Sequence, residues 1–592
     1  MPLPLQSARE YGDDMRKRLK KIFAWGLVGL VALIASGLLL ADHLTPQATG
    51  APSWTLPLER DATAIDRELM PLLDRNPGMS GVILVPDGLD AFASRAISAR
   101  QAGRSLDVQY YIWKDDLAGH LLLNELWQAA ERGVRVRLLL DDISTRGKDG
   151  ALLAFDQHPN IEIRVYNPFR NRDGLARLLE MVQRAWSITH RMHNKAWIAD
   201  GRVAVVGGRN VGLEYFDAAE DVNFRDLDVV VFGPEVNSAN AIFDAFWNSQ
   251  AVVPISALNS KSSRRLDEVM AGIREEVESE EARRFLDLVD TSDSVRRYFL
   301  QTLEPYWSSS LRIMSDPPVK RNGDRRDGWL ITPILEDLRS ARGKALVVSP
   351  YFVPGPEGVV LMAQSVRAGV HVGVVTNSLA ANDVLAVHSG YSRYRKQMLR
   401  HGVALYETKP GVATESSVFG SSGASLHTKA YIVDDRRGFV GSFNVDPRSI
   451  DLNTEMGLFF DDPALGAALR ELYVHLSSPE LAYWVYINDE GRLRWLDAAA
   501  TPPRGAGQRA GIHPPAAPAG VVHDLAADRI PAVTPCTAYG AARWACRQLP
   551  GQARRMRPPS APVRGCRAPA VIPSPTATGP VRPRIAPQRS LR

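Results

Sequence analysis

The chain carries the segment His193-Asn-Lys195-Ala-Trp-Ile-Ala-Asp200 and repeats its pattern in His427-Thr-Lys429-Ala-Tyr-Ile-Val-Asp434. Both copies read His-x-Lys-x-x-x-x-Asp. At the same offset behind each copy stand two small residues, a variable residue and an asparagine, in Gly207-Gly208-Arg209-Asn210 and in Gly441-Ser442-Phe443-Asn444. One bare copy arises by chance in roughly a few per cent of chains of this length. Two copies that share a downstream tetrad indicate an internal duplication.

Each copy is expected to form a short strand, because aromatic and β-branched residues follow the lysine. Side chains two positions apart share a face of a strand, so His193 and Lys195 point the same way, as do His427 and Lys429. The small residues of the tetrads predict a turn where the backbone passes close to a ligand. If the two copies pack together, two imidazoles, two ammonium groups and two amides meet in one small volume.

This set of side chains suits a phosphate diester. Lys195 and Lys429 can neutralise its non-bridging oxygens, a task that a metal ion performs in other enzymes, so we expect neither a metal nor a cofactor. One histidine can attack phosphorus and form a covalent phosphohistidine. The other can protonate the leaving alcohol and then accept a proton from the incoming nucleophile. The two copies are nearly alike, so the residues alone leave open which histidine plays which role.

Further residues are expected to support this centre. Asp200 and Asp434 are suited to orient the imidazoles and fix their tautomers. Asn210 and Asn444 are expected to donate hydrogen bonds to the phosphate. Acidic residues also follow each tetrad, namely Asp226 or Asp228 in the first half and Glu455 in the second. They serve either in the reaction or as charge partners of nearby lysines and arginines.

The repeat extends upstream of both motifs. Residues 107–113 and 132–142 are strand-like runs separated by a helical stretch, and residues 345–352 and 368–377 repeat this arrangement. Strands that alternate with helices predict an α/β fold with mixed, mainly parallel sheets flanked by helices. Between the halves, residues 262–289 are dense in Glu and Arg, which predicts a solvated helix rather than a site.

The two motifs are the duplicated signature of the phospholipase D superfamily, which the chain resembles from about residue 65 to 490. The resemblance implies two phospholipase D-like domains related by a pseudo-twofold axis, with the active site between them and His193 as the nucleophile. Departures at Lys114 and Leu213 concern substrate detail and not the chemistry. Six segments are similar to bacterial cardiolipin synthases of the C type: 109–113, 207–216, 224–228, 349–354, 376–383 and 390–391.

The N-terminal region predicts a membrane anchor. Residues 22–41 are apolar apart from Ser36, and a helix of this length spans about 30 Å, the thickness of a hydrocarbon core. Five basic residues lie between Arg16 and Lys21, and no Lys or Arg follows before Arg60. This bias predicts an uncleaved anchor in a bacterial inner membrane, with residues 1–21 cytoplasmic and the enzyme body on the periplasmic face. A cleaved signal peptide is the alternative.

The basic character of the chain comes from its C-terminal end. Residues 501–592 carry fourteen arginines against two aspartates, without Lys or Glu, whereas the whole chain has a net charge of +5, so residues 1–500 are net acidic. An acidic body does not suit a groove that follows nucleic acid. The tail also holds seventeen of the forty prolines and all three cysteines, which predicts disorder or translation in a wrong frame.

The prediction for the whole chain is a phosphatidyltransferase that makes cardiolipin from phosphatidylglycerol, with or without phosphatidylethanolamine as a second phospholipid. The alternatives are a phospholipase D that releases phosphatidic acid, a nuclease and a non-catalytic membrane scaffold. Donor, acceptor and oligomeric state stay open. The predicted parts are a basic segment (1–21), an anchor (22–41), a linker (42–64), a first domain (65–260), a charged helical connection (261–310), a second domain (311–500) and a tail (501–592).

Overall fold

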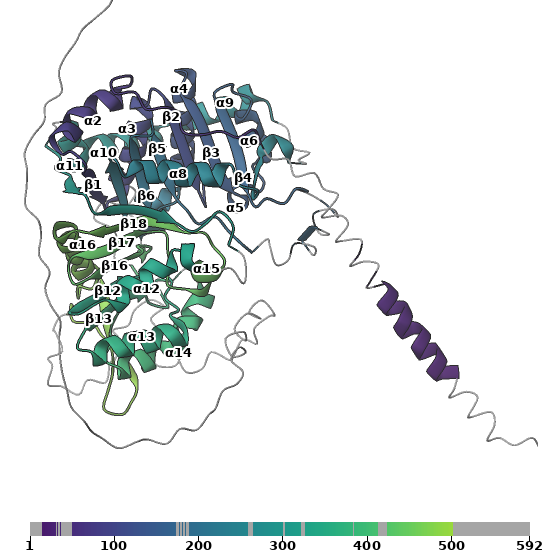
Figure 1. The fold of residues 1–592 in the computed structure, drawn as a ribbon, viewed down its shortest axis with the longest axis vertical. Helices are drawn as coiled ribbons and strands as arrows, with labels where there is room; N and C mark the ends of the chain where they lie inside the picture. Colours follow the sequence, from purple (N-terminus) through teal and green to yellow (C-terminus); the bar gives the residue numbers. More distant parts are fainter. Residues whose placement is uncertain are drawn as a thin grey trace, which may run out of the picture. The chain divides into compact units, whose positions relative to one another are not determined.

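The computed structural model contains two α/β halves, each built on a nine-stranded mixed sheet (Figure 1). It describes residues 15–30, 32, 36, 50–172, 174, 177, 180–181, 184, 189–258, 264–299, 302–320, 326–382, 384–411 and 423–500. The first sheet has the strand order β10-β1-β8-β6-β5-β2-β3-β4-β9, and the second has β11-β18-β17-β16-β12-β13-β14-β19-β20.

The first half and the connection behind it contain the following elements: α2 (Ala64–Arg75), β1 (Ser80–Val85), α3 (Gly88–Gln101), β2 (Ser105–Tyr110), α4 (Leu117–Glu131), β3 (Arg135–Asp141), α5 (Asp142–Thr145), α6 (Asp149–Phe155), β4 (Ile161–Tyr166), β5 (Ala196–Ala199), β6 (Val203–Gly207), η1 (Leu213–Tyr215), β7 (Val222–Arg225), β8 (Asp228–Phe232), α8 (Val236–Trp247), β9 (Val252–Pro254), η2 (Ile255–Ala257), α9 (Leu266–Val277), α10 (Glu280–Thr291), α11 (Asp293–Phe299) and β10 (Tyr306–Ser308).

The second half contains these elements: β11 (Leu311–Ser315), η3 (Arg326–Gly328), α12 (Ile331–Arg339), β12 (Lys344–Val348), α13 (Gly355–Arg367), β13 (His371–Asn377), α14 (Leu385–Arg400), β14 (Ala404–Thr408), β15 (Gly423–Leu426), β16 (Ala430–Val433), β17 (Arg437–Gly441), α15 (Pro447–Asp451), β18 (Met456–Asp461), α16 (Pro463–Leu476), β19 (Ala482–Ile487) and β20 (Leu493–Leu496).

The two sheets share one strand order. The run β1-β8-β6-β5-β2-β3-β4-β9 corresponds to β11-β18-β17-β16-β12-β13-β14-β19, with β10 and β20 added at edges. The duplication seen in the motifs therefore covers both whole sheets. The predicted order of strand, helix, Gly-Val turn and strand is confirmed in both halves, where Gly133 and Gly369 follow α4 and α13 with φ of 89° and 88°, a conformation that favours glycine.

The expectation of mainly parallel sheets is wrong. Among the described strands of each sheet, two neighbouring pairs are parallel: β2–β3 and β3–β4 in the first half, and β12–β13 and β13–β14 in the second. Parallel neighbours need a crossover, which helices supply here. The motif strands β5 and β16 are instead followed by tight turns into β6 and β17, and this forces antiparallel pairing.

Apolar side chains connect the two halves. One cluster lies in the first half and one in the second, whereas a third combines both, with Phe243 and Trp247 of α8, Leu469 of α16 and strand residues of both sheets. Strand β6 contacts both β17 and β18 of the other half. The equivalent central strands thus face one another, as a pseudo-twofold arrangement requires.

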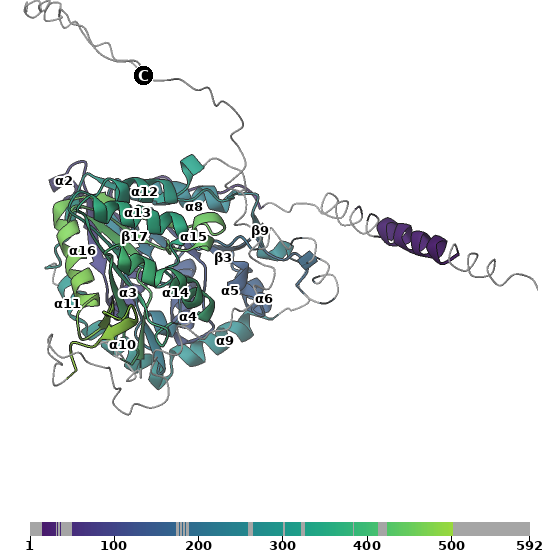
Figure 2. The same ribbon diagram turned by 90° about the horizontal axis from the view of Figure 1, so that it is seen from below.

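The charged connection was predicted to be a solvated helix, and this prediction is wrong. The connection forms α9, α10 and α11, and α9 and α10 lie against α4 and α3 on the outside of the first half (Figure 2). Val269, Met270 and Ile273 of α9 are buried, and Phe285 of α10 packs edge-on against Phe92 of α3 at 4.8 Å between ring centroids. The frequent Glu and Arg residues concealed an apolar face that repeats at helical spacing.

Two predicted regions are outside or at the edge of the described chain. Residues 15–30, 32 and 36 are helical, and no helix among the described residues is both long enough and apolar enough to cross a membrane. Residues 31, 33–35 and 37–41 of the expected anchor lie outside the described part, as does the whole tail from residue 501.

Candidate active site

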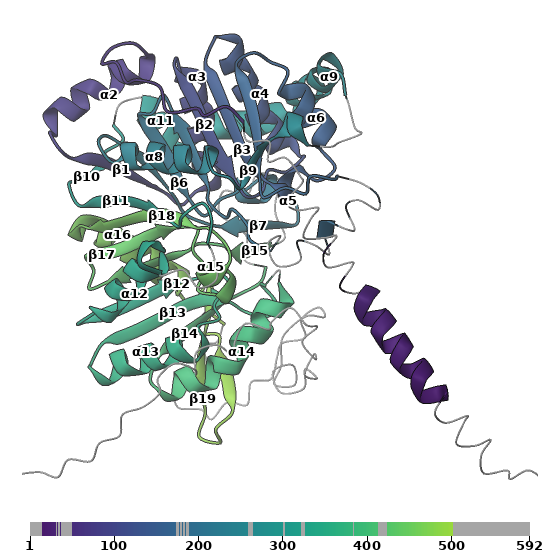
Figure 3. The same ribbon diagram turned by 45° about the vertical axis from the view of Figure 1, so that its right-hand side comes forward.

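The two motif histidines are positioned by backbone pairing between the halves. Strand β15, which leads to His427, runs parallel to β7 of the first half with Leu426 opposite Arg225 (Figure 3). An isolated parallel bridge between Met192 and Thr454 likewise joins the two halves beside His193. His427 follows Leu426, and Asp226 follows the paired Arg225. In the same way His193 follows Met192, and Glu455 follows the paired Thr454. The register alone therefore brings each histidine beside a carboxylate of the opposite half.

His193 is held by Glu455. Its Nδ1 lies 2.7 Å from Oε2 of Glu455 and 3.2 Å from the carbonyl oxygen of Ser442. Both side chains are buried. With Nδ1–H donating to the carboxylate, Nε2 is the ring atom that remains for a substrate.

His427 is held in the same way by Asp226. Its Nδ1 lies 2.5 Å from Oδ2 of Asp226, which also is buried. Of the two acids considered from the sequence, Asp226 is thus the one beside the site. Asp228 instead accepts a hydrogen bond from Arg95 at 2.8 Å within the core of the first half.

The expectation that Asp200 and Asp434 orient the imidazoles is wrong. Asp200 accepts hydrogen bonds from the backbone N–H groups of residues 103–105, and Asp434 does so from residues 342–344. Both stand in the left-handed region, with φ of 53° and 54°, at the far end of strands β5 and β16. A strand of four residues adds about 13 Å, which separates each Asp from its own histidine. The spacing shared by the two motif copies thus reflects a turn that ties two strands together.

The two lysines lie close to both histidines. Lys195 donates to the carbonyl oxygen of His193 at 2.7 Å, and Lys429 donates to that of His427. Burial, followed by the charge of Lys429, lowers the pKa of Lys195 to about 7. The charges of both lysines act on each imidazole, so the four groups share one electrostatic environment.

The protonation states favour neutral imidazoles beside ionised carboxylates. Burial, helped by the charges of Lys195 and Lys429, lowers the pKa of His193 to about 4. Burial and Lys429 also lower the pKa of His427. Burial opposes ionisation of Glu455 and Asp226, but the neighbouring imidazole and lysine charges outweigh it and hold the pKa of both acids below their usual range. A neutral imidazole is the form that can attack phosphorus.

The small residues of the tetrads make room for the carboxylates and for neighbouring strands, whereas a close approach of a ligand to them stays a prediction. A Cβ on Gly208 would lie 2.2 Å from Oδ1 of Asp226, so the absence of a side chain makes room for that acid. The equivalent Ser442 instead donates its hydroxyl to Glu455. Gly207 and Gly441 end strands β6 and β17, and a Cβ on Gly441 would lie 2.4 Å from the carbonyl oxygen of Met456.

The two tetrad asparagines differ. Asn210 accepts from the backbone N–H of Ile112 at 3.2 Å and donates to the hydroxyl of Tyr215 at 2.8 Å, which fixes its orientation. An amide has a second N–H, so a contact to phosphate stays a prediction. Asn444 is buried, and its Oδ1 has no hydrogen-bond partner among the described residues.

A second layer of buried contacts, which the motifs did not predict, holds Glu455. Asp316 donates its backbone N–H to the carbonyl oxygen of Glu455 and accepts from the Glu455 N–H, both at 2.9 Å. Lys320 pairs with Asp316 at 2.8 Å and donates to the carbonyl oxygen of Ser449, whose hydroxyl reaches Oε1 of Glu455 at 2.7 Å. Duplication was the signal that identified the site, and Asp316 and Lys320 lie outside the duplicated motif and its tetrad.

Aromatic rings surround both histidines. Tyr111 lies 4.9 Å from the ring of His193, and Phe224 and Tyr351 lie 5.1 and 6.3 Å from that of His427. Burial, with the charge of Asp141, raises the pKa of Tyr111 to about 12. Four further aromatic residues of the segments that lead to the site are buried in apolar clusters: Tyr110, Trp113, Phe352 and Tyr391.

Comparison with known proteins agrees with this geometry. The family profile described as "Cardiolipin synthase, PLD-like domain" matches residues 97–247 and 334–476. Cardiolipin synthase C of Escherichia coli (strain K12) is 40% identical over 441 residues, which are 73% of this chain and 92% of that protein. The chain belongs to the cardiolipin synthase family of phospholipase D-like proteins.

More distant relatives extend the comparison. A cardiolipin synthase of Staphylococcus aureus (strain Mu50) is 25% identical over 66% of this chain and 65% of its own length. The crystal structure of phosphatidylserine synthase from Haemophilus influenzae matches 73% of this chain and 92% of its own, with a TM-score of 0.48 and 15% identity.

Proposed function

We propose that this protein is a phosphatidyltransferase that makes cardiolipin from phosphatidylglycerol and a second phospholipid through a phosphohistidine. The observation that carries the proposal is the crossed pairing of the two histidines, each with its Nδ1 on a buried carboxylate of the opposite half. Both Nε2 atoms are thereby available, and two lysines lie beside them. The relationship to proteins named cardiolipin synthase supports a lipid as the substrate.

The first step transfers the phosphatidyl group to the enzyme. Nε2 of His193 attacks phosphorus, the N–P bond forms, and the bond from phosphorus to the head-group oxygen breaks. The imidazolium of His427 gives its Nε2 proton to the departing alcohol. His427 is neutral in the empty site, but an entering phosphate brings a negative charge that favours its protonated form.

The second step returns the enzyme to its starting state. The terminal glycerol hydroxyl of phosphatidylglycerol loses its proton to His427 as its oxygen attacks phosphorus, and the bond to His193 breaks. Lys195 and Lys429 are suited to stabilise the charge that develops on the non-bridging oxygens. Glu455 and Asp226 hold the imidazoles in the tautomer that keeps Nε2 free for phosphorus or for the proton.

His193 is the nucleophile in this proposal. Glu455 receives two hydroxyl hydrogen bonds, from Ser442 and Ser449, in addition to the one from His193. Asp226 receives one backbone N–H, from Leu227, in addition to His427. The more strongly stabilised carboxylate is suited to the imidazole that must remain fixed while it carries a covalent group.

A membrane location completes the proposal. We expect residues 22–41 to anchor the protein in a bacterial inner membrane, with residues 1–21 in the cytoplasm, because five basic residues precede this apolar run. The enzyme body then meets lipids on the periplasmic side. A reporter domain fused after residue 60 should be active only outside the cytoplasm, and a cytoplasmic reporter would reject this orientation.

The reaction is tested by lipid analysis. Purified protein in bilayers of phosphatidylglycerol, with or without phosphatidylethanolamine, should give cardiolipin as its main product. If phosphatidic acid predominates, the protein is a phospholipase D, since water then outcompetes the lipid alcohol for the same intermediate. If neither lipid product forms but a single-stranded oligonucleotide is cleaved, the lipid assignment is wrong.

The intermediate is tested by trapping. His193→Ala and His427→Ala should each abolish turnover, because nucleophile and acid act as one unit. His427→Ala should still accumulate the phosphatidyl group on His193, which mass spectrometry of quenched protein can locate. An adduct found on His427 in the wild-type protein would reverse the two roles.

A further inference from the structure

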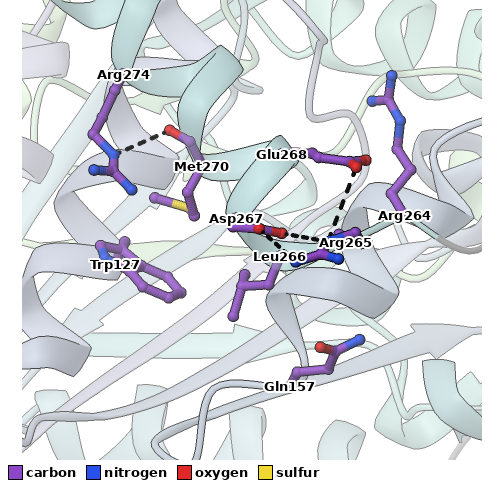
Figure 4. A pocket seen from close by; sticks show the side chains of 9 residues that line it. All are labelled: Trp127, Gln157, Arg264, Arg265, Leu266, Asp267, Glu268, Met270 and Arg274. Atoms are coloured by element: carbon purple, nitrogen blue, oxygen red, sulfur yellow. Dashed lines mark hydrogen bonds and ion pairs between the residues drawn. The ribbon is translucent and has the colours of Figure 1, made fainter.

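Two hollows adjoin helix α9, and they differ in chemistry. The one on the outer side is bordered by Trp127 and Met270 and by charged residues of the α9 N-terminus (Figure 4). Arg265 pairs there with Asp267 at 2.8 Å, and Arg274 donates to the carbonyl oxygen of Met270 at 3.3 Å. These groups already have partners and lie at an open surface, so this hollow has no evident need for a ligand.

The other hollow has an apolar floor. It measures about 710 Å³ and lies between strand β3, helix α6 and helix α9. Aliphatic and aromatic side chains form one part of its lining, which includes Leu138, Leu140, Leu152, Phe155, Val269 and Ile273. Polar and charged side chains form another part, which consists of Lys114, Asp115, His120, Ser144, Lys148, Arg264 and Glu268. Cavities that hold small organic ligands usually measure roughly 300–1,000 Å³ and have mainly apolar walls with few polar groups. The size and the apolar part of the lining therefore suit an alkyl chain.

A lysine that makes no direct ion pair stands at the rim of this cavity, where the charges of Asp115 and Asp116 also act on it. Lys148 is half-buried and donates to the carbonyl oxygen of Trp113 at 2.7 Å. It forms no ion pair with any described residue, whereas Lys114 on the same rim pairs with Glu214 at 2.6 Å, and His120 contacts both Asp115 and Glu276. A partly buried ammonium is more stable beside an anion, so the rim favours a negatively charged group next to the apolar space.

The cavity is linked to the reacting histidine through the segment that follows β2. The carbonyl oxygen of Trp113 accepts from Ser144 as well as Lys148, and both of these residues line the cavity. Trp113 follows Tyr111 by two positions, and the ring of Tyr111 lies 4.9 Å from that of His193. The cavity thus begins at the same ends of β2 and β3 from which the active site is built.

The cavity has no equivalent wall in the other half. Its outer side is helix α9, which follows β9 in the first half. In the described part of the second half, strand β20 and no helix follows β19, the counterpart of β9. The two halves are otherwise built alike, so α9 gives the His193 half a feature that separates its role from that of the His427 half.

We propose that this cavity holds one acyl chain of the phospholipid whose phosphatidyl group is transferred to His193, with Lys148 beside the anionic end of that lipid. The inference rests on the proposed function, because it assigns the cavity to the donor substrate of that reaction. It predicts that the enzyme distinguishes donor lipids by acyl-chain length through α9.

Position 272 offers a variant that fills the cavity without disturbing the fold. Gly272 lies on α9 and lines the cavity, and a Cβ added there meets no atom within 4 Å. Gly272→Phe places a ring in the space. Gly272→Ala is the matched control, since both changes remove a helical glycine, which should stabilise α9, whereas only the ring occupies the cavity.

The kinetic test compares short-chain and long-chain donor lipids. Gly272→Phe should lower kcat/KM for dioleoyl-phosphatidylglycerol about tenfold or more, and for the dihexanoyl lipid less than about twofold, relative to Gly272→Ala. Lys148→Met should raise KM for the long-chain donor with little change in kcat. Equal effects of Gly272→Phe on both lipids, or no effect on either, would overturn the inference.

A binding test separates this inference from the proposed reaction. Phosphatidylglycerol with a photoreactive diazirine near the end of one acyl chain should label peptides of α6 and α9 on irradiation, and Gly272→Phe should abolish the label. Labelling without any transfer product would reject the proposed function and keep the cavity assignment. Transfer without labelling of α6 or α9 would reject the cavity assignment and keep the function.

Discussion

At the scale of single residues, Glu455 and Asp226 fix the tautomers of the two histidines, whereas the motif aspartates do not contact them. Glu455 and Asp226 touch Nδ1 of the imidazoles, whereas Asp200 and Asp434 bind backbone N–H groups at the opposite ends of the motif strands. A carboxylate thus orients an imidazole at positions 455 and 226, and it stabilises a turn at positions 200 and 434.

This difference predicts two separable phenotypes. Glu455→Gln and Asp226→Asn should each lower kcat roughly a hundredfold or more, because an amide can hold the imidazole in the wrong tautomer. Asp200→Asn should lower the melting temperature by several degrees, because it weakens three hydrogen bonds of an ionised group, with a smaller loss in kcat. Kinetics and thermal unfolding of the three purified variants check this. A larger kcat loss in Asp200→Asn than in Glu455→Gln would return the orienting role to the motif aspartate.

The pH dependence follows from the two displaced pKa values. The pKa of His193 is lowered to about 4, so the imidazole is neutral and nucleophilic above that pH and loses its lone pair below it. The pKa of Lys195 is lowered to about 7, so its charge is present below that pH and lost above it. The kcat/KM of the wild-type enzyme should therefore fall below about pH 4 and also above about pH 7.

The control for the alkaline limb is Lys195→Arg. Its guanidinium stays charged at any accessible pH, so the residual activity of the variant should not decline between about pH 6 and 8. A wild-type kcat/KM that is constant across this range would show that Lys195 does not titrate there.

At the scale of elements, the connection between the halves belongs to the first half. Helices α9 and α10 contribute Val269, Ile273 and Phe285 to its apolar cluster, although their exposed faces are rich in Glu and Arg. The connection therefore acts as an outer layer over α3 and α4, and it builds one wall of the cavity beside the site.

Packing of this layer is tested on α10. Phe285→Ala should destabilise the protein by about 3–5 kcal/mol, because the ring is fully buried against Phe92 and its loss leaves a cavity. Leu288→Ala on the same helix is the control, since Leu288 is 41% exposed and should change stability by no more than about 0.5 kcal/mol. Denaturant unfolding monitors both. Similar midpoints for the two variants would show that α10 is not packed in solution.

At the scale of the whole molecule, the halves are held together by a shared apolar cluster and by the crossed pairing at the site. The central cluster takes side chains from α8, α16 and strands of both sheets. Because each histidine depends on the opposite half for its carboxylate, a relative shift of the halves would disrupt both pairs at once.

The C-terminal tail should contribute nothing to this body. Ending the chain at residue 500 removes seventeen of the forty prolines and no strand of either sheet, since β20 ends at Leu496. The shortened protein should keep its melting temperature and its lipid product, as measured by thermal unfolding and by lipid extraction. A loss of either would show that residues 501–592 take part in folding or in substrate binding.

The sequence by itself determined the duplication, the phosphodiester chemistry and the local order of elements. These features depend on spacing within a few residues, such as His193 with Lys195 or a helix that ends at Gly133, and short-range geometry follows directly from such spacing. The aromatic and β-branched residues of each motif likewise predicted the short strands β5 and β16.

Only the tertiary structure decided which acid serves which histidine. His193 and Glu455 lie 262 positions apart, and His427 and Asp226 lie 201 apart, and they meet because strands from different halves pair in one register. It also decided that most strand pairs are antiparallel, that Asp316 and Lys320 support Glu455, and that α9 closes a cavity in the first half. Each depends on contacts between distant segments, for which the spacing of residues along the chain carries no information.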